Sequence, residues 1–531
     1  MPTYLTPGVY VEEVDFGSKP IEGVSTSVAA FVGFTANAPA DDPTALAPRL
    51  VTSWGDYTRI YGGFVEGAML PHAVYGYFAN GGGSCYIVRI PHAGSTQDTS
   101  PRVALPSATK DELETLRIRA LDAAGPYEVV IEPATPSSGE GDSGDGGGAA
   151  GTFTLKVRTA GRDVETFPDL TFSRGARNVE TVVNRESTTI RVEAPTAQGV
   201  AAVDRIPVAG VHRLQPVAAD SAKVGTSEFR GDEAARSGIG GLVIADEVTM
   251  VAVPDLITAA ATNGSVDLGL YKEVQTALID HCEKSANRMA ILDSPPGMTP
   301  QQVKEWRSET AMYDAKFAAF YYPWLEVSNP LGDRGADGAP TLTIPPCGHV
   351  AGIWARNDAS RGVWKAPANE VVRGALNVAM KVTSKEQELL NPNGINCIRA
   401  FGTRGIRVWG ARTLSSDPSW RYVNVRRLFT YLEESILRGT QWIVFEPNDM
   451  DLWQRVKRTI NAFLIGLWRQ GALLGATPEQ AFYVKCDEET NPPESIDEGK
   501  LVVEVGIAPV KPAEFVIFRI SQWQGGASTA E

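Results

Sequence analysis

The chain reads TMVAVPD at residues 249–255, NRMAILDSP at 287–295 and KFAAFYYPWLEV at 316–327. Each segment contains a short apolar run of the kind that forms a buried strand. Stretches with helical spacing separate the three segments, at about 269–285 and 300–314. Strands that alternate with helices in this way are typical of βαβ units, whose strands run parallel. The sequence therefore predicts a central, mainly parallel α/β sheet.

The N-terminal part of the chain is predicted to join this α/β domain. Apolar runs at 27–34 (SVAAFVGF) and 84–90 (SCYIVRI) flank a helical stretch at 70–82 that ends in glycine. This order of strand, helix and strand matches the centre of the chain. We therefore assign residues 25–90 plus 237–393 to one central domain.

The intervening residues 91–236 change character. Short β-prone runs, such as YEVVIEP at 127–133 and GTFTLKVRTA at 151–160, alternate with turns, and residues 137–151 form a loop rich in Gly and Ser. The segment is predicted to be an inserted, mostly β domain with a long surface loop.

Residues 394–511 are predicted to form an α+β C-terminal domain. Two β-prone runs, INCIRAFG and RGIRVWGART, precede two amphipathic helices. The first helix has an apolar face and is followed by Gly439, which is placed to cap it; the face consists of Val425, Leu428, Phe429, Leu432 and Ile436. The second helix is predicted over about 449–474, begun by Asn448. The β-prone runs AFYVKC and KLVVEVGIAPV follow.

The cysteines are predicted to be packed and reduced. In the helix near 269–285, Leu270, Val274, Leu278 and Cys282 recur at every fourth position, which places this cysteine on the buried stripe. No pair has C-x-x-C spacing and no histidine cluster lies nearby. The full set is Cys85, Cys282, Cys347, Cys397 and Cys486.

The two ends of the chain are predicted to be extended arms, 1–24 and 512–531. In the first arm, Pro and Gly surround one β-prone run that contains Val9, Tyr10 and Val11. In the second, apolar residues lie on both faces of a short strand, which predicts burial on both sides; they are Phe515, Val516, Ile517, Phe518 and Ile520. Such a strand needs a partner, either in the chain's own sheet or at a sheet edge of a neighbouring molecule.

Composition and charge exclude several classes of protein. The 531 residues are 43% hydrophobic and 21% charged, which is typical of a soluble, folded, multidomain protein. The formal net charge of −14 makes nucleic acid and anionic lipid poor partners. The apolar runs are far shorter than the roughly 20 residues of a membrane span. The N-terminus lacks the pattern of a secretory signal, so we expect assembly in the cytoplasm.

Catalytic and metal-binding motifs do not occur in the sequence. G-x-S-x-G, H-E-x-x-H, Walker A and complete G-x-G-x-x-G patterns are missing. His281 fits the edge of a helical core better than a catalytic role, and His349, near Cys347, lacks further ligands. The acidic loop residues 140–145 lack the spacing of a calcium-binding EF-hand. We therefore predict no enzyme activity, no cofactor and no metal.

Several motifs resemble those of contractile tail sheath proteins from phage tails and related injection systems. TPGVYVEEV at 6–14 is similar to the opening arm of that family, and HAVYGYFANGGGSCYIVRI at 72–90 to its helix, glycine turn and strand. GVWKAPANEVVRGA at 362–375 is similar to an Ala-Pro motif of the family. The block 394–523 resembles the sheath C-terminal domain almost throughout, whereas 91–236 matches nothing comparable.

The resemblance implies a structural subunit with a central domain of subtilisin-like topology. Such subunits form stacked hexameric rings around an inner tube, exchange terminal arms with neighbours, and contract to drive the tube through a target envelope. The implied partners are other copies of the chain, the tube protein, and baseplate and terminal cap proteins, with neither nucleic acid nor membrane insertion. The particle is a phage tail or a phage-tail-like injection system, which in some systems is released from the cell.

One helix is assigned to the tube through this resemblance. The helix at 449–474 has a basic polar stripe on an acidic protein, and a helix of the C-terminal domain faces the tube in this family. Arg455, Arg458 and Arg469 are therefore candidates for contacts with tube carboxylates, although a solvated face balanced by nearby acids has the same pattern.

Two other functions fit parts of the sequence. An α/β hydrolase or nucleotide-binding enzyme would share the predicted central sheet, because a fold alone does not define chemistry. A non-contractile filament or capsid subunit would share the arms.

Overall fold

The computed structural model describes residues 20–39, 46–90, 101–110, 113–121, 127–133, 152–159, 161–173, 175–195, 202–214, 224–262, 265–332 and 340–519. The chain divides into two compact units. The first consists of Met1–Ser25, Arg361–Ala366 and Tyr422–Glu531, and the second of Thr26–Ser360 and Pro367–Arg421. We call them the C-terminal unit and the central unit.

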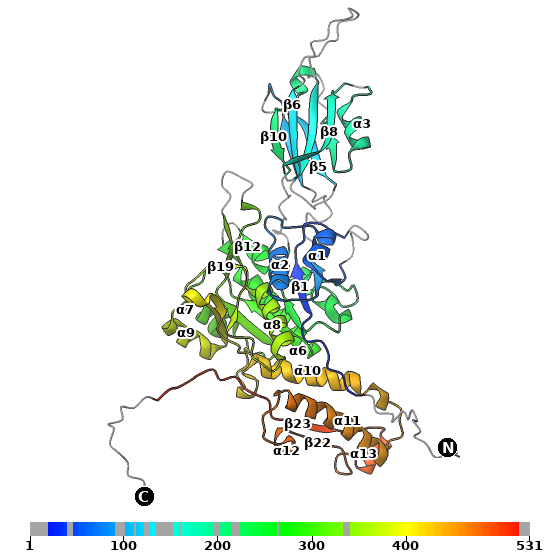
Figure 1. Ribbon diagram of the computed structural model, residues 1–531, viewed down its shortest axis with the longest axis vertical. Helices are drawn as coiled ribbons and strands as arrows, with labels where there is room; N and C mark the ends of the chain where they lie inside the picture. Colours follow the sequence, from blue (N-terminus) through cyan, green and yellow to red (C-terminus); the bar gives the residue numbers. More distant parts are fainter. Residues whose placement is uncertain are drawn as a thin grey trace, which may run out of the picture. The chain divides into compact units, whose positions relative to one another are not determined.

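A nine-stranded sheet forms the core of the central unit (Figure 1). Its order is β18 (Glu370–Val371), β21 (Ile406–Val408), β20 (Ile395–Ala400), β15 (Ala318–Tyr322), β14 (Met289–Asp293), β11 (Met250–Ala252), β1 (Ala29–Gly33), β3 (Cys85–Arg89) and β2 (Arg49–Val51). The six strands from β20 to β3 are parallel, and the pairs at both edges are antiparallel. The predicted mainly parallel α/β sheet is confirmed.

Helices connect the strands of this sheet, as the alternating sequence pattern predicts. They are α1 (Trp54–Tyr61), α2 (Leu70–Asn80), α4 (Thr226–Arg230), α5 (Leu256–Ala260), α6 (Leu268–Ser285), α7 (Pro300–Glu305), which continues as a π-helix over Trp306–Ala311, α8 (Cys347–Arg361) and α9 (Ser384–Leu390). Gly81 ends α2 in the left-handed conformation, as predicted from its glycine. Cys282 is fully buried on α6, but Leu270 at the start of the predicted stripe is only half-buried.

Smaller sheets complete the central unit. One contains β17 (Thr341–Ile344), β16 (Leu325–Ser328) and β19 (Ala375–Val378), and the other β12 (Ala261–Thr262) and β13 (Ser265–Val266). Helices α2 and α8 approach each other closely, because a side chain at Gly348 or Gly352 would collide with the α2 backbone.

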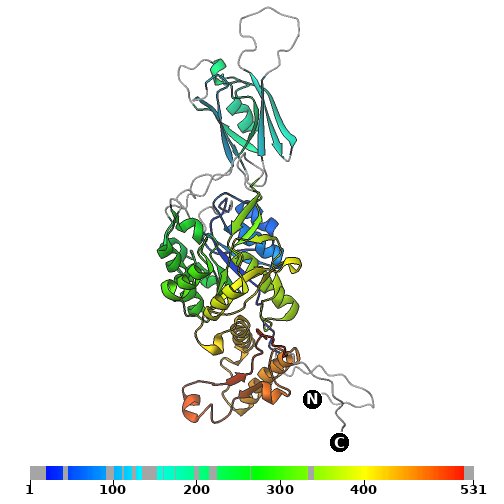
Figure 2. The same ribbon diagram turned by 90° about the vertical axis from the view of Figure 1, so that its left-hand side faces the viewer.

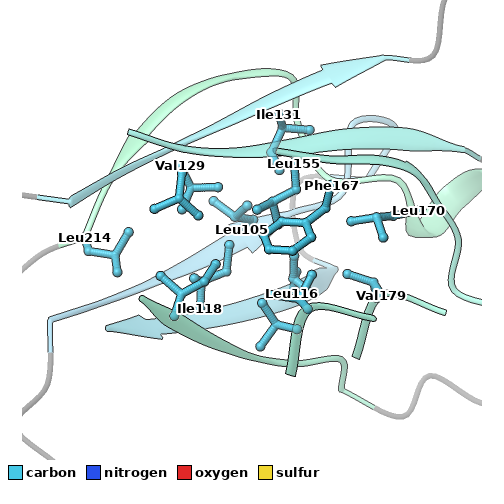
Figure 3. Packing of buried hydrophobic residues seen from close by; sticks show 14 of the residues in the cluster. Leu105, Leu116, Ile118, Val129, Ile131, Leu155, Phe167, Leu170, Val179 and Leu214 are labelled. Atoms are coloured by element: carbon cyan, nitrogen blue, oxygen red, sulfur yellow. The ribbon is translucent and has the colours of Figure 1, made fainter. Parts of the chain in front are cut away.

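The insertion has its own core between two antiparallel sheets. One sheet has the order β10 (Gly210–Arg213), β6 (Tyr127–Pro133), β7 (Phe153–Thr159), β8 (Arg162–Leu170), and the other β4 (Arg102–Pro106), β5 (Glu114–Ala120), β9 (Ile190–Glu193). Figure 3 shows side chains of both sheets, such as Leu116 and Leu155, meeting in one apolar cluster. Helix α3 (Val179–Glu186) packs on the strands and buries Val179 and Val183 in this cluster (Figure 2). The predicted mostly β character is confirmed for the described residues.

The C-terminal unit is built on two amphipathic helices, α10 (Val423–Gly439) and α11 (Met450–Arg469), which pack through one apolar cluster. The two-stranded ribbon of β22 (Phe482–Lys485) and β23 (Glu504–Ile507) adds to that cluster, together with α12 (Pro478–Ala481). Helix α13 (Pro493–Asp497) lies between the strands in the sequence.

Two details of the predicted C-terminal domain are wrong. The residues 394–421 belong to the central unit, because β20 pairs with β15 in the large sheet. The N-cap of helix α11 is Asp449, whose carboxylate accepts the Leu452 N–H at 2.8 Å, and not Asn448, and the helix ends at Arg469 and not near 474. The Asn448 side chain instead accepts the indole N–H of Trp453 at 2.8 Å.

Candidate assembly site

Helix α10 holds the chain segment that follows the N-terminal arm. Ile21 is buried in the apolar cluster of the C-terminal unit, and the Val24 N–H donates to Ser435 Oγ at 3.2 Å. A Cβ atom added at Gly439 would lie 2.7 Å from Ile21 Cγ1. Gly439 is the last residue of α10 and not the cap beyond it, so the predicted cap is wrong. Its missing side chain leaves space for Ile21.

The same helix also holds the segment that leads into the C-terminal arm. The Asn424 side chain, which is buried, donates to Trp364 O at 2.8 Å and to Val510 O at 3.1 Å. The Tyr422 hydroxyl donates to Glu514 Oε2 at 3.3 Å. Asn424 and Ser435 are eleven residues apart, which is about 16 Å along a helix. Both terminal segments are therefore anchored on one rigid element.

The predicted arm strand is exposed and unpaired in the described part of the single chain. Phe515, Val516, Ile517 and Phe518 are 72%, 68%, 79% and 83% exposed, and no strand is formed there. Four consecutive exposed apolar residues are unusual on a monomer surface. Val9, Tyr10, Val11 and Ile520 lie outside the described residues.

The β22–β23 ribbon offers sheet edges close to this anchor. In the described residues no third strand pairs with either side of the ribbon. Phe482 and Val484 face the apolar cluster, whereas Tyr483 lies over Gly506 on the exposed face and is 58% exposed. In the described residues the outer sides of the ribbon thus have no strand partner and adjoin apolar surface, which is the combination that accepts an added strand.

The three candidate tube-contact arginines lie on α11 but do not form one cluster of free charges. Arg455 forms an ion pair with Glu446 at 3.0 Å and lies over the Trp442 ring at 5.4 Å. Arg458 is exposed and donates to Gln454 O of its own helix at 3.2 Å. Arg469 is exposed in the last turn. The charge of Arg455 is therefore balanced within the chain.

Buried ionisable groups of the central unit serve the fold. The fully buried Asp255 accepts N–H groups from Phe34 at 2.7 Å and Leu70 at 3.1 Å, and also from Met69. Burial raises the pKa of Asp255 to about 7 and lowers the pKa of His349 to about 4. Among the described residues no His, Cys, Asp and Glu side chains gather as a metal site.

Two models of known protein-family domains match consecutive parts of the chain. Residues 247–414 match the model of the phage tail sheath protein central domain, and residues 415–522 match that of the phage tail sheath C-terminal domain. Together they cover just over half of the chain, in this order. The chain belongs to the phage tail sheath family. Tail sheath proteins are structural components and not enzymes, as predicted.

Relatives support the same family membership. A prophage major tail sheath protein of Pseudomonas aeruginosa is 30% identical over 189 residues, which is 34% of this chain and 47% of that protein. The tail sheath protein of Salmonella phage ViI is 28% identical over 40% of this chain and 32% of its own length. The chain thus spans less than half the length of these sheath relatives.

Solved sheath structures share the fold. The helical sheath of the anti-feeding prophage in its contracted state superposes with a TM-score of 0.57, at 24% identity, over 98% of this chain and all of that chain. The sheath complex of the PVC extracellular contractile injection system, also contracted, gives 0.56 at 24% identity over 98% and 99%. In the part of the chain described here, no helix is long and apolar enough to cross a membrane.

Sequence reasoning missed the anchor on α10. Ser435 and Gly439 are four residues apart, a spacing that places two small side chains on one helix face. That signal was available, but a glycine near a helix end is more simply interpreted as a cap. The role of Asn424 had no signal in the sheath sequence, since its partners are 60 and 86 residues away.

A matched pair of glycine substitutions tests the anchor. We expect Gly439→Ala to displace Ile21 and destabilise the C-terminal unit by about 1–3 kcal/mol, because the added methyl group has no space. At Gly466 on α11 an added Cβ would meet no atom within 4 Å beyond the helix's own backbone. Gly466→Ala is therefore expected to be neutral or stabilising by about 0.5–1 kcal/mol. Urea unfolding measures both. Equal effects of the two substitutions would show that Ile21 does not occupy the space beside Gly439.

Proposed function

We propose that the chain is the sheath subunit of a contractile phage tail or phage-tail-like injection system. The subunits polymerise as stacked hexameric rings around an inner tube and contract to drive the tube through a target envelope. The observation that carries this proposal is the anchoring of both terminal segments on α10, beside an exposed apolar arm and an open ribbon. The match to both sheath domains and the fold shared with two contracted sheaths support it.

Arm exchange would link the subunits. Phe515, Val516, Ile517, Phe518 and Ile520 would add a strand to the β22–β23 ribbon of a neighbour, and Val9, Tyr10 and Val11 would do the same from the N-terminal arm. Backbone hydrogen bonds contribute affinity in this mode, and side-chain contacts set the register. Because each arm leaves from α10, a pull on either arm acts on one helix. The links would therefore persist while the lattice changes length.

The remaining partners and the domain plan follow from the same proposal. Baseplate and terminal cap proteins would bind the ends of the sheath, and assembly would take place in the cytoplasm before any release of the particle. The central unit would have a subtilisin-like topology, with the insertion 91–236 as an outer domain and 1–24 and 512–531 as linking arms.

The tube would contact α11 mainly through Arg458 and Arg469, with Arg455 in a supporting position because Glu446 already balances its charge. Exposed pairs of this kind are individually weak and screened by salt, so several per subunit are needed. Reversal of Arg458 and Arg469 to Glu is expected to reduce co-sedimentation with the tube protein. Unchanged co-sedimentation would contradict this assignment.

Electron microscopy of the chain co-expressed with its tube protein tests the proposed function. We expect striated cylinders that occur in a long, narrow form and a short, wide form. An enzyme with a similar central sheet would form no cylinders, and a non-contractile filament subunit would give cylinders of one diameter only. Either of these results would contradict the proposal.

A further inference from the structure

The hairpin formed by β20 and β21 brings three arginines of the central unit together, of which Arg404 is exposed while Arg399 and Arg407 are half-buried. Arg399 and Arg407 face each other across the two strands. The Arg399 guanidinium lies 5.3 Å from the centre of the Phe401 ring, and that of Arg404 lies 4.9 Å from it. Like charges directly opposite each other destabilise a strand pair. The repulsion between the two facing guanidinium groups, Arg399 and Arg407, is therefore a cost to the fold.

Neutral groups hold Arg399 and Arg407 in place. Arg399 donates to Gln387 Oε1 at 2.8 Å, and Arg407 donates to Asn369 O at 2.7 Å and to Arg404 O at 3.0 Å. Among the described residues no carboxylate lies within ion-pair distance of Arg399, Arg404 or Arg407. The hairpin thus presents positive charge that is ordered but not neutralised, on a chain whose net charge is −14.

The C-terminal unit carries the opposite charge in one short segment. Six of the twelve residues 487–498 are acidic and none is basic. Lys485 pairs with Glu489 and Lys500 with Glu498, but in the described part of the chain Glu488, Glu494 and Asp497 have no basic partner. All three are exposed. Arginine forks bind carboxylates in a bidentate manner, so the two surfaces are chemically complementary.

We propose that the Arg399, Arg404 and Arg407 hairpin binds the acidic segment 487–498 of a second copy of the chain. This proposal rests on the proposed sheath function and adds a contact apart from the arms. Two different surfaces that bind each other across copies form a heterologous contact, which generates rings or helices. A nucleic acid is a poorer occupant, because the acidic chain as a whole repels phosphates.

Charge reversal with rescue tests this contact in the full chain. Arg404→Glu with Arg407→Glu, and separately Glu494→Lys with Asp497→Lys, are each expected to raise the subunit concentration needed for cylinders about tenfold. All four substitutions in one chain restore opposite charges and are expected to bring that concentration back to within about threefold of the original. Cylinder yield is measured by sedimentation and microscopy, and thermal unfolding confirms that each variant is folded.

Matched single substitutions keep the test valid if the double variant does not fold. Arg404 is exposed, and Arg404→Glu is compared with Lys284→Glu, an exposed lysine at the end of α6. Only the first is expected to weaken assembly, and added salt should reduce the difference. Two results would overturn the assigned partner. One is that Arg404→Glu with Arg407→Glu abolishes assembly and the acidic-segment substitutions do not rescue it. The other is that the chain binds a labelled DNA and Arg404→Glu abolishes this binding. If all variants assembled equally well, the contact between the hairpin and the acidic segment would be wrong and the sheath function would remain. If the unsubstituted chain formed no cylinders, both the contact and the sheath function would be wrong.

Discussion

A chain that ends at Lys511 is expected to stay folded as a monomer and to form no cylinders. The removed residues 515–518 are mostly exposed in the single chain, so their loss costs the fold little. The bond from Asn424 to Val510 O remains and keeps the preceding segment in place. The lost strand would remove several intermolecular backbone hydrogen bonds, each contributing about 0.5–1.5 kcal/mol, together with the burial of four apolar side chains. Sedimentation velocity and microscopy measure the result.

Deletions at the N-terminus separate the role of the arm from that of the buried segment behind it. Removal of residues 1–19 is expected to have the same effect, because it takes the arm and leaves the buried Ile21 in its place beside Gly439. Removal of residues 1–24 also takes Ile21 and the bond from Val24 to Ser435, and is expected to destabilise the C-terminal unit by about 2–5 kcal/mol. Cylinders of normal length from either arm deletion would contradict the linking role of the arms.

Asp255→Ala is expected to destabilise the central unit by about 3–5 kcal/mol. Asp255 is fully buried and accepts three backbone N–H groups, from Phe34 directly after β1, from Met69 at the N-cap of α2 and from Leu70, its first residue. Helix α2 has no capping side chain of its own. Alanine would leave these donors unsatisfied in the interior, where each costs about 1–3 kcal/mol. Denaturant unfolding of the full chain measures the change.

Asp267→Ala is the matched control for this prediction. Asp267 also accepts two backbone N–H groups, from Gly269 at 2.9 Å and Leu270 at 3.0 Å, but at the exposed start of α6. Water replaces that cap, so the expected cost is about 1 kcal/mol. If the two alanine variants were equally stable, the Asp255 bonds would not hold β1 and α2 together.

The protonation of Asp255 gives this effect a pH dependence. The pKa of Asp255 is raised from 3.8 to about 7, because burial raises it by more than the three N–H groups lower it. Between about pH 4 and 7 the folded chain therefore keeps a proton on Asp255 that the unfolded chain has already released. The stability from this proton is fully present below pH 4 and is lost as the pH rises through 7. Asp255→Asn removes this dependence, so its stability relative to the original chain should rise over the same range.

The centre of the fold was predictable because its signals are local. Strands such as β14 and β15 are buried along their whole length and are therefore continuous apolar runs. Gly81 follows a helical stretch and ends α2, as its freedom to adopt positive φ implies. The Cys282 position followed from helical spacing alone.

The errors arose where distant parts of the chain decide the outcome. The membership of β20 depends on its pairing with β15, about 75 residues earlier, and no local pattern encodes that choice. Asn448 and Asp449 are both good capping residues, and the contact of Asn448 with Trp453 selects Asp449. For the arms, the local sequence is informative but the partner is missing from the single chain. Their sequence shows that they need a partner, but a single chain does not contain it.

Cross-linking between two single-cysteine variants tests arm exchange most directly. All five natural cysteines are buried, so a new exposed cysteine is the reactive one. One variant carries Ile517→Cys on the arm and the other Val505→Cys on the ribbon. When the two are mixed, assembled and treated with a short bismaleimide, every link between these positions joins two different subunits. We predict covalent dimers when the mixed subunits are assembled into cylinders, and none when the same mixture is kept below the concentration at which cylinders form. Cylinders that form without any such dimer would contradict the exchange of this arm between neighbouring ribbons.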